Sequence, residues 1–132
     1  SVANIRETGV FCVNIVEYAI RDAMNASSKT LPAAADEFAH AGLQREPCRE
    51  IDCARVANGP AALECRLTQI ITLEGETNFL VLGEVVGIHM RDDCMVEGMF
   101  DVTKFFPLAR LGYKDYAKID APFSLLRPDE IA

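Results

Sequence analysis

The 132-residue chain is poor in basic residues: 13 lysines and arginines stand against 20 aspartates and glutamates, so the net charge is −7. No cluster of lysine and arginine interrupts this acidic balance. Binding to a phosphate backbone needs several convergent cations, and docking on an anionic membrane needs a basic face. The composition therefore argues against nucleic acid and against a membrane surface as partners.

The chain also lacks long apolar segments. No run approaches the roughly 20 apolar residues that a membrane-spanning helix needs, and no cleavable leader is visible. Half of the residues are hydrophobic and a quarter are charged, which is an ordinary balance for a globular protein. The length and composition predict one folded domain with its own core.

Paired cysteine motifs are absent, because the five cysteines are odd in number and form no CxxC. Cys12 and Cys65 lie in apolar, strand-like runs, where a free cysteine behaves as a small hydrophobic residue. No cysteine or histidine pair has the spacing of zinc ligands. These features predict reduced thiols, a cytoplasmic location and no metal site. The five cysteines are Cys12, Cys48, Cys53, Cys65 and Cys94.

Short helices around one strand are predicted for the first 60 residues. Ser1 is expected to cap the first helix, and Gly9 is expected to end it in the left-handed region. The expected segments are a helix over 1–9, a strand over 10–16, a helix over 17–28, a loop around Pro32, a helix over 36–42, and a loop over 44–60 with an edge strand near 51–56.

The centre of the chain is predicted to be β-structure. Leu63, Cys65 and Leu67 alternate with polar residues, a period of two that predicts one dry and one wet face. After a turn, the segment 78–90 is apolar nearly throughout, as expected for a strand that is buried on both faces. A helix capped by Asp101, interrupted by Pro107 and ended by Gly112 is expected next, which completes an α+β or small-barrel layout.

Glycines and two polar residues interrupt the apolar strand 78–90. Gly83 and Gly87 indicate a bulge, a sharp bend, or close approach of another backbone or a ligand. Glu84 is expected to be buried and to form a structural ion pair with Arg66 on the preceding strand. His89 ends the strand and is either a hydrogen-bonded structural histidine or a contact to a ligand.

Both chain ends carry candidate ligand contacts. Ser1 either only caps its helix or, with the free N–H groups there, contacts an anion. In "ARLGYKDY", Arg110 suits a phosphate or carboxylate, and Tyr113 or Tyr116 suits a flat ring. The alternative is a helix end with tyrosines at the rim of the core. No GxGxxG, P-loop, GxSxG or HExxH motif is present, so the residues alone predict an α+β domain with a pocket.

A set of short strings occurs in a familiar order: "NIRETGVFCVN", "AMNASS", "DEFAHAGL", "GPAALECRL", "NFLVLGEVVGIH" and "PLARLGYKDYA". From Ser1 to about Ala117 the chain resembles the flavin reductase-like, FMN-binding split-barrel family. Members of that family usually carry several strands before a Lys-Asp-Thr/Ser-x-x-Asn-Ile motif, and Ser1 matches its hydroxyl residue. The chain therefore resembles the C-terminal part of such a domain, 1–117, followed by a tail, 118–132. A second departure is Tyr113, which stands where a second glycine is common and is expected to crowd that loop.

The resemblance implies an α+β, mainly β protein with an antiparallel split β-barrel and flanking short helices. It also implies a homodimer that binds FMN near the subunit interface and transfers a hydride from NAD(P)H to the flavin, with a monooxygenase component as a further partner. Two other functions stay open: an FMN-binding electron carrier, or a non-catalytic dimerisation domain.

Particular residues gain roles from the resemblance. Ser1 would contact the FMN phosphate, and His89, as the catalytic-site residue, would lie beside the isoalloxazine or the nicotinamide. Arg110 and Tyr116 would lie near the flavin, and Asn25 and Ser27 would reach it from the partner subunit. Hydride transfer needs position rather than proton abstraction, which agrees with the lack of an obvious catalytic dyad.

Overall fold

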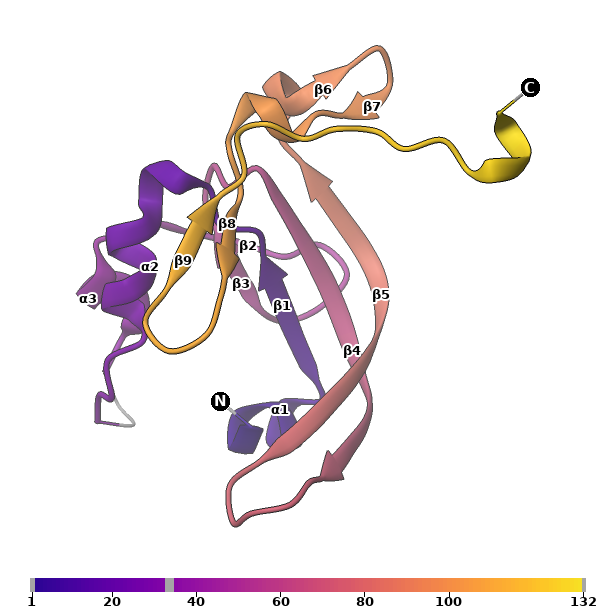
Figure 1. Ribbon diagram of the computed structural model, residues 1–132. Coiled ribbons are helices and arrows are strands. Elements are labelled where there is room, and N and C mark those ends of the chain that lie inside the picture. The colour runs from indigo at the N-terminus through magenta and orange to yellow at the C-terminus, as the bar shows by residue number, and fades with distance from the viewer. Residues whose placement is uncertain (1, 33–34, 132) are drawn as a thin grey trace.

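A long antiparallel hairpin forms the body of the protein (Figure 1). The computed structural model describes residues 2–32 and 35–131. Strands β4 (Ala61–Thr72) and β5 (Phe79–Met90) each have 12 residues and pair along their whole length. Strand β1 (Val10–Asn14) pairs with the other edge of β4, so the sheet has the order β1-β4-β5.

Two glycines of β5 mark the places where this hairpin is irregular. The β4–β5 register shifts beside the pairs that Gly87 forms with Glu64 and that Gly83 forms with Leu67. A Cβ atom on Gly83 would lie 2.5 Å from Cζ of Phe11, so the ring would have to move, and a Cβ on Gly87 would lie 3.2 Å from Cδ of Glu64. The register shifts confirm the predicted bulge, whereas the atom nearest to each of these Cβ positions belongs to a side chain rather than to another backbone.

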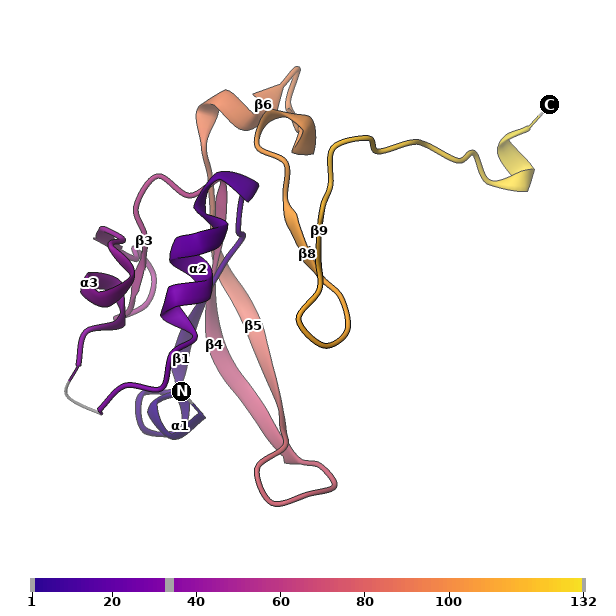
Figure 2. The same cartoon turned by 60° about the vertical axis from the view of Figure 1, so that its left-hand side comes forward.

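Short helices lie beside the sheet, as the sequence predicted. Helix α1 (Val2–Thr8) ends at Gly9, whose φ is 73°; Ser1, its expected cap, lies outside the described residues. A 3₁₀ turn (Tyr18–Ile20) leads into α2 (Arg21–Ser27), which lies beside α3 (Glu37–Ala41) (Figures 1 and 2). Asp36 caps α3 by accepting the N–H groups of Phe38 and Ala39, and Gly42 ends it at φ 72°.

Three small hairpins complete the structure. The strands are β2 (Arg45–Pro47) with β3 (Ala54–Val56), β6 (Met95–Val96) with β7 (Met99–Phe100), and β8 (Leu108–Arg110) with β9 (Tyr116–Lys118). Single 3₁₀ turns occur at Asp92–Cys94, Val102–Lys104 and Pro128–Glu130.

The helix expected from Asp101 to Gly112 is wrong. Asp101 does cap a turn, since its carboxylate accepts the N–H of Thr103 at 2.9 Å, but the turn ends at Lys104. Beyond it the backbone is bound to other segments instead of to itself: Phe106 accepts the N–H of Tyr18 at 2.8 Å, and Leu108 donates to Val16 at 3.0 Å. These tertiary hydrogen bonds replace the helical ones and place β8 next to the start of α2.

Burial is unequal between the strands. Ala62, Glu64 and Cys65 of β4 are buried, as are Ile51 and Phe105, which lie outside the strands. The expectation that β5 is buried on both faces is wrong: its large apolar side chains are 40–51% exposed, and in the described residues no further strand pairs with its outer edge. These side chains are Leu80, Leu82, Val85, Ile88 and Met90.

The C-terminal segment extends away from the body after β9 (Figures 1 and 2). Its apolar side chains Phe123 and Leu125 are more than four-fifths exposed. None of the helices in residues 2–32 and 35–131 is long and apolar enough to cross a membrane.

Candidate functional site

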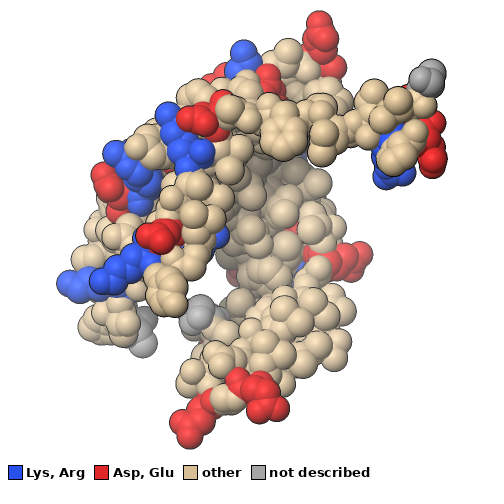
Figure 3. Space-filling model, in the orientation of Figure 1, with Lys and Arg blue, Asp and Glu red and all other residues tan. Residues whose placement is uncertain are grey.

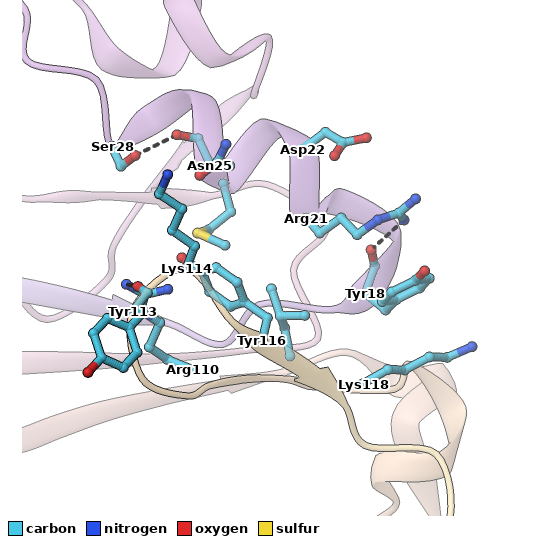
Figure 4. A pocket seen from close by; sticks show the side chains of 12 residues that line it. Tyr18, Arg21, Asp22, Asn25, Ser28, Arg110, Tyr113, Lys114, Tyr116 and Lys118 are labelled. Atoms are coloured by element: carbon cyan, nitrogen blue, oxygen red, sulfur yellow. Dashed lines mark hydrogen bonds between the residues drawn. The ribbon is translucent and has the colours of Figure 1, made fainter.

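A cavity of about 680 Å³ lies between α2 and the β8–β9 hairpin (Figure 4). This volume falls in the range of small-molecule sites, roughly 300–1,000 Å³. We call it the tyrosine–cation pocket, because its lining is dominated by two kinds of side chain. Its tyrosines are Tyr18, Tyr113 and Tyr116, its cations are Arg21, Arg110, Lys114 and Lys118, and Asp22, Met24, Asn25, Ser28 and Leu108 complete it.

The β8–β9 hairpin positions one side of the pocket. Arg110 and Tyr116 are directly paired across the hairpin, and the guanidinium carbon lies 4.6 Å from the tyrosine ring centroid. Arg110 also donates to the carbonyl oxygen of Tyr113 at the tip. Tyr113 is 95% exposed and has a φ of 58°, a left-handed conformation that favours glycine. This explains why glycine would suit its position.

Helix α2 and the turn before it position the other side. The Tyr18 ring has the Arg21 guanidinium carbon 4.2 Å and the Lys118 ammonium nitrogen 4.7 Å from its centroid. Asn25 lines the pocket one turn further along the helix, where its carbonyl oxygen accepts from the hydroxyl of Ser28 (Figure 4). The hydroxyl of Ser27 donates back to Met24 at 2.6 Å, so it is engaged within the helix.

The cations of the pocket have no carboxylate partners. Five ion pairs occur in the part of the chain that the structure describes, and none of them involves Arg21, Arg110, Lys114 or Lys118. Asp22 is the one carboxylate among the described lining residues. In Figure 3, lysines and arginines gather over the helices and the β8–β9 hairpin. In a chain of net charge −7, four cations that form no ion pair with any described carboxylate, beside three aromatic rings, suit an anionic ligand with a flat ring.

His89 lies elsewhere, in a second cavity of about 560 Å³ between the end of β5 and the β2–β3 hairpin. Three arginines share this cavity, and two of them are neutralised: Arg55 by Glu46, and Arg91 by Asp93 and Glu17. The third is Arg49. No residue lines both cavities, so within one chain the structure does not bring His89 to Arg110 and Tyr116.

The imidazole of His89 is bound to a buried acid, Glu64, through Nε2. The Glu64 side chain is 0% exposed and also accepts the backbone N–H groups of Arg49 at 3.0 Å and Glu50 at 2.7 Å. Burial pushes its pKa upward, but the hydrogen bonds from Arg49, His89 and Glu50 outweigh burial and lower the pKa to about 2. Glu64 is therefore an ionised carboxylate that joins β4, β5 and the loop after β2.

Two expectations about acids in the sheet are thereby wrong. Glu84 is exposed, not buried, and although it stands opposite Arg66 in the β4–β5 register, the two described side chains form no ion pair. Arg66 donates instead to the carbonyl of Glu50 at 3.2 Å. Glu64 was assigned to the wet face of β4, but the loop that follows β2 covers it, and the register shift beside it changes the local alternation.

The structure thus brings together three of the six residues chosen from the sequence: Asn25, Arg110 and Tyr116. His89 lines the second cavity, Ser27 lies on α2 without lining the pocket, and Ser1 lies outside the described residues. Reasoning from sequence missed Tyr18, Arg21, Lys114 and Lys118. Lys114, Tyr116 and Lys118 do alternate in the sequence, and this period of two signals a common strand face.

The three-stranded sheet with its small hairpins and short helices is an α+β fold, and its tyrosine–cation pocket has the chemistry to suit an anionic ligand with a flat ring. A family model for the flavin reductase like domain matches residues 1–109, so the chain belongs to the flavin reductase-like family. An uncharacterized protein of Deinococcus radiodurans is 38% identical over 97 residues, which cover 74% of this chain and 42% of that protein. The chain thus spans less than half of that curated relative.

Solved structures agree with the family and confirm the predicted fold. The 2-nitrobenzoate 2-nitroreductase NbaA of Pseudomonas fluorescens has a TM-score of 0.84 and 28% identity, over 99% of this chain and 66% of that one. Nitrilotriacetate monooxygenase component B of Bacillus cereus has a TM-score of 0.86 and 27% identity, over 94% and 63%. A Shewanella frigidimarina protein described as having a split barrel domain of flavin reductase type has a TM-score of 0.84 and 22% identity. The match covers 96% of this chain and 64% of that one.

Proposed function

We propose that this chain is the flavin-binding part of an oxidoreductase that holds FMN and passes a hydride to it from NAD(P)H. The observation that carries the proposal is the set of four cations without carboxylate partners around three tyrosines. FMN combines a phosphate with a flat heterocycle, and a nicotinamide nucleotide does the same. The residues present fit either molecule, and membership in the flavin reductase-like family favours the pair of them.

Different residues of the pocket are proposed to bind different parts of the flavin. A bound flavin supplies hydride acceptance, whereas the protein binds, orients and excludes water. Arg110 and Lys114 neutralise phosphate charge, Tyr116 offers a ring face that Arg110 holds in place, and Asn25 offers an amide to a ring edge. Ser1, from its match to the family motif, is proposed to contact the phosphate, and Ser27 to support Asn25 from the same helix.

His89 is proposed to act as a positioning residue. Its imidazole is held by Glu64, which in turn holds the loop after β2, so His89 sets the local shape of the sheet end. Direct contact of His89 with a flavin in the tyrosine–cation pocket requires a second chain to complete the site, whereas the resemblance implied that the partner subunit supplies Asn25 and Ser27.

A homodimer is proposed to cover the outer face of β5. Five large apolar side chains there are 40–51% exposed, and contiguous apolar surface of this kind marks interaction sites. A reduced, cytoplasmic protein remains part of the proposal. The electron acceptors suggested by the similar proteins are a monooxygenase supplied with reduced flavin and a nitroaromatic compound.

Titration of FMN into the purified protein, followed by anaerobic addition of NADH or NADPH, tests the proposal. We expect saturable quenching of flavin fluorescence and then bleaching by a nicotinamide nucleotide. Lys114→Met should weaken FMN binding about tenfold, whereas the matched change Lys104→Met, outside the pocket, should not. Full FMN occupancy without bleaching would identify an electron carrier, and no FMN uptake would refute both in favour of a dimerisation domain.

A further inference from the structure

Two of the five cysteines lie at the closed end of the β2–β3 hairpin, where Cys48 directly follows β2 and Cys53 directly precedes β3. This hairpin pairs Glu46 with Arg55 and Pro47 with Ala54, and extending the same register by one step sets Cys48 opposite Cys53. One backbone hydrogen bond supports that step, since the N–H of Cys48 donates to the carbonyl of Cys53 at 2.9 Å, while the N–H of Cys53 donates to the carbonyl of Ile51 at 3.0 Å. Directly opposed residues of an antiparallel pair have Cα atoms about 4.5–5.5 Å apart, and a disulfide accepts about 4.4–6.8 Å.

We propose that Cys48 and Cys53 form a reversible dithiol–disulfide site, which peroxides oxidise and small thiols reduce. Both cysteines are free and half-buried, and they flank a four-residue loop in which Arg49, Glu50 and Asp52 are exposed. A peroxide therefore reaches the pair from the surface. Cys65 and Cys94, in contrast, are buried, and Cys94 is 0% exposed.

The loop between the two cysteines is already held in a closed form. Arg49 and Glu50 donate their backbone N–H groups to Glu64, and Ile51, also in the loop, is buried. The neck of the loop is thus fixed by contacts other than a sulfur–sulfur bond. Because the backbone hydrogen bond from Cys48 to Cys53 already holds the two ends of the loop together, we expect the disulfide to form by rotation of the two side chains and to lock the loop beside Glu64.

A third thiol, Cys12, lies on β1 opposite Glu64 and is the competing partner for Cys48. Burial raises the pKa of Cys12 to about 12, so it stays a neutral thiol at neutral pH and does not attack a peroxide. Burial also raises the pKa of Cys48. In the described part of the chain, no group of three or more cysteines, histidines or acids is arranged to hold a metal ion.

The oxidation balances with one peroxide molecule. The Cys53 thiolate attacks one peroxide oxygen, the O–O bond breaks, and the departing oxygen takes a proton and leaves as water. The Cys48 sulfur then attacks the sulfenic sulfur of Cys53, the S–O bond breaks, and a second water leaves with the proton of Cys48. Two thiols and one hydrogen peroxide thus give one disulfide and two waters, and a dithiol reductant reverses the change.

Peptide mapping of the whole chain tests the assignment. Trypsin cleaves after Arg45, Arg49 and Arg55, so the disulfide would join peptide 46–49 to peptide 50–55. After treatment with one equivalent of hydrogen peroxide and alkylation of free thiols, we expect this linked pair, a mass loss of two hydrogens, and a melting temperature raised by several degrees. Dithiothreitol should return all three readouts to the starting values.

Variants separate the proposed pair from its competitors. Cys12→Ala should keep the linked peptides, whereas Cys48→Ala and Cys53→Ala should each abolish them and leave the far-UV circular dichroism of the reduced protein unchanged. A link from peptide 46–49 to the peptide that carries Cys12, links between chains, or sulfinic acid without any link would each overturn the proposal. The test does not involve flavin, so its outcome is independent of whether the proposed function is correct.

Discussion

Glu64→Gln probes the buried acid with the smallest possible change. Glutamine keeps the shape of the side chain but has only one accepting oxygen. The two oxygens of the carboxylate bind the N–H groups of Arg49 and Glu50 and the imidazole of His89. One buried N–H then faces an amide donor. A hydrogen bond to a charged group contributes about 1.5–3 kcal/mol, and an unsatisfied buried donor costs about 1–3 kcal/mol. We expect a loss of about 2–4 kcal/mol in the free energy of unfolding at pH 7.

The pKa of Glu64 also predicts how the stability difference between the wild-type protein and Glu64→Gln changes with pH. The folded-state pKa of Glu64 is lowered from 4.5 to about 2, so its ionised form stabilises the protein above pH 4.5. That contribution is lost as the pH falls from about 4.5 toward 2. The gap between the wild-type protein and Glu64→Gln should therefore be widest near neutral pH and should narrow in acid.

Urea unfolding followed by circular dichroism measures the gap, with Glu84→Gln as the matched control. Glu84 is exposed on the neighbouring strand and forms no ion pair with Arg66, so its change should stay within about 0.5 kcal/mol. If Glu64→Gln unfolds at the same urea concentration as Glu84→Gln, or if its deficit is constant from pH 7 to pH 3, the role assigned to the carboxylate is wrong.

Other predictions concern the pocket and the open strand. Arg110→Met should weaken FMN binding roughly tenfold to a hundredfold, measured by fluorescence quenching. Binding equal to that of the wild-type protein would show that Arg110 does not contact FMN. Tyr113→Gly should relieve the left-handed backbone, gaining up to about 1 kcal/mol in urea unfolding while loosening ligand binding; a loss of stability would contradict this. Val85→Asp should raise the dimer dissociation constant about tenfold or more in analytical ultracentrifugation, unless another surface forms the dimer. Arg91→Met should weaken FMN binding although Arg91 does not line the pocket, and an unchanged affinity would show that the two cavities are independent.

Local signals in the sequence predicted the elements that local forces determine. Gly9 and Gly42 end helices in the left-handed region, and Asp36 caps α3, because these residues act within a few positions of themselves. The segment 101–112 failed for the opposite reason. Its backbone hydrogen bonds go to Val16 and Tyr18, more than 80 residues away, and no local pattern reports such partners.

The two acids of the hairpin show where periodicity stops being informative. Alternation assigned Glu64 to the wet face, and an apolar neighbourhood assigned Glu84 to the core, yet the structure has the reverse. Burial depends on what covers a face, and the loop containing Arg49 and Glu50 covers Glu64. The covering segment comes from another hairpin, so the strand's own residues carried no sign of it.

The ion pair between Arg91 and Glu17 explains how the two cavities can belong to one site. Arg91 follows β5 two residues after His89, and its guanidinium donates to both carboxylate oxygens of Glu17 at 3.3 Å. This contact raises the pKa of Arg91 above its ordinary value, so the guanidinium stays charged at any physiological pH. Glu17 forms a bridge with Pro107 immediately before β8, and Tyr18 follows it in the wall of the tyrosine–cation pocket. The end of β5 is thereby fastened to both elements that hold the proposed flavin, which is how His89 can influence that site without touching it.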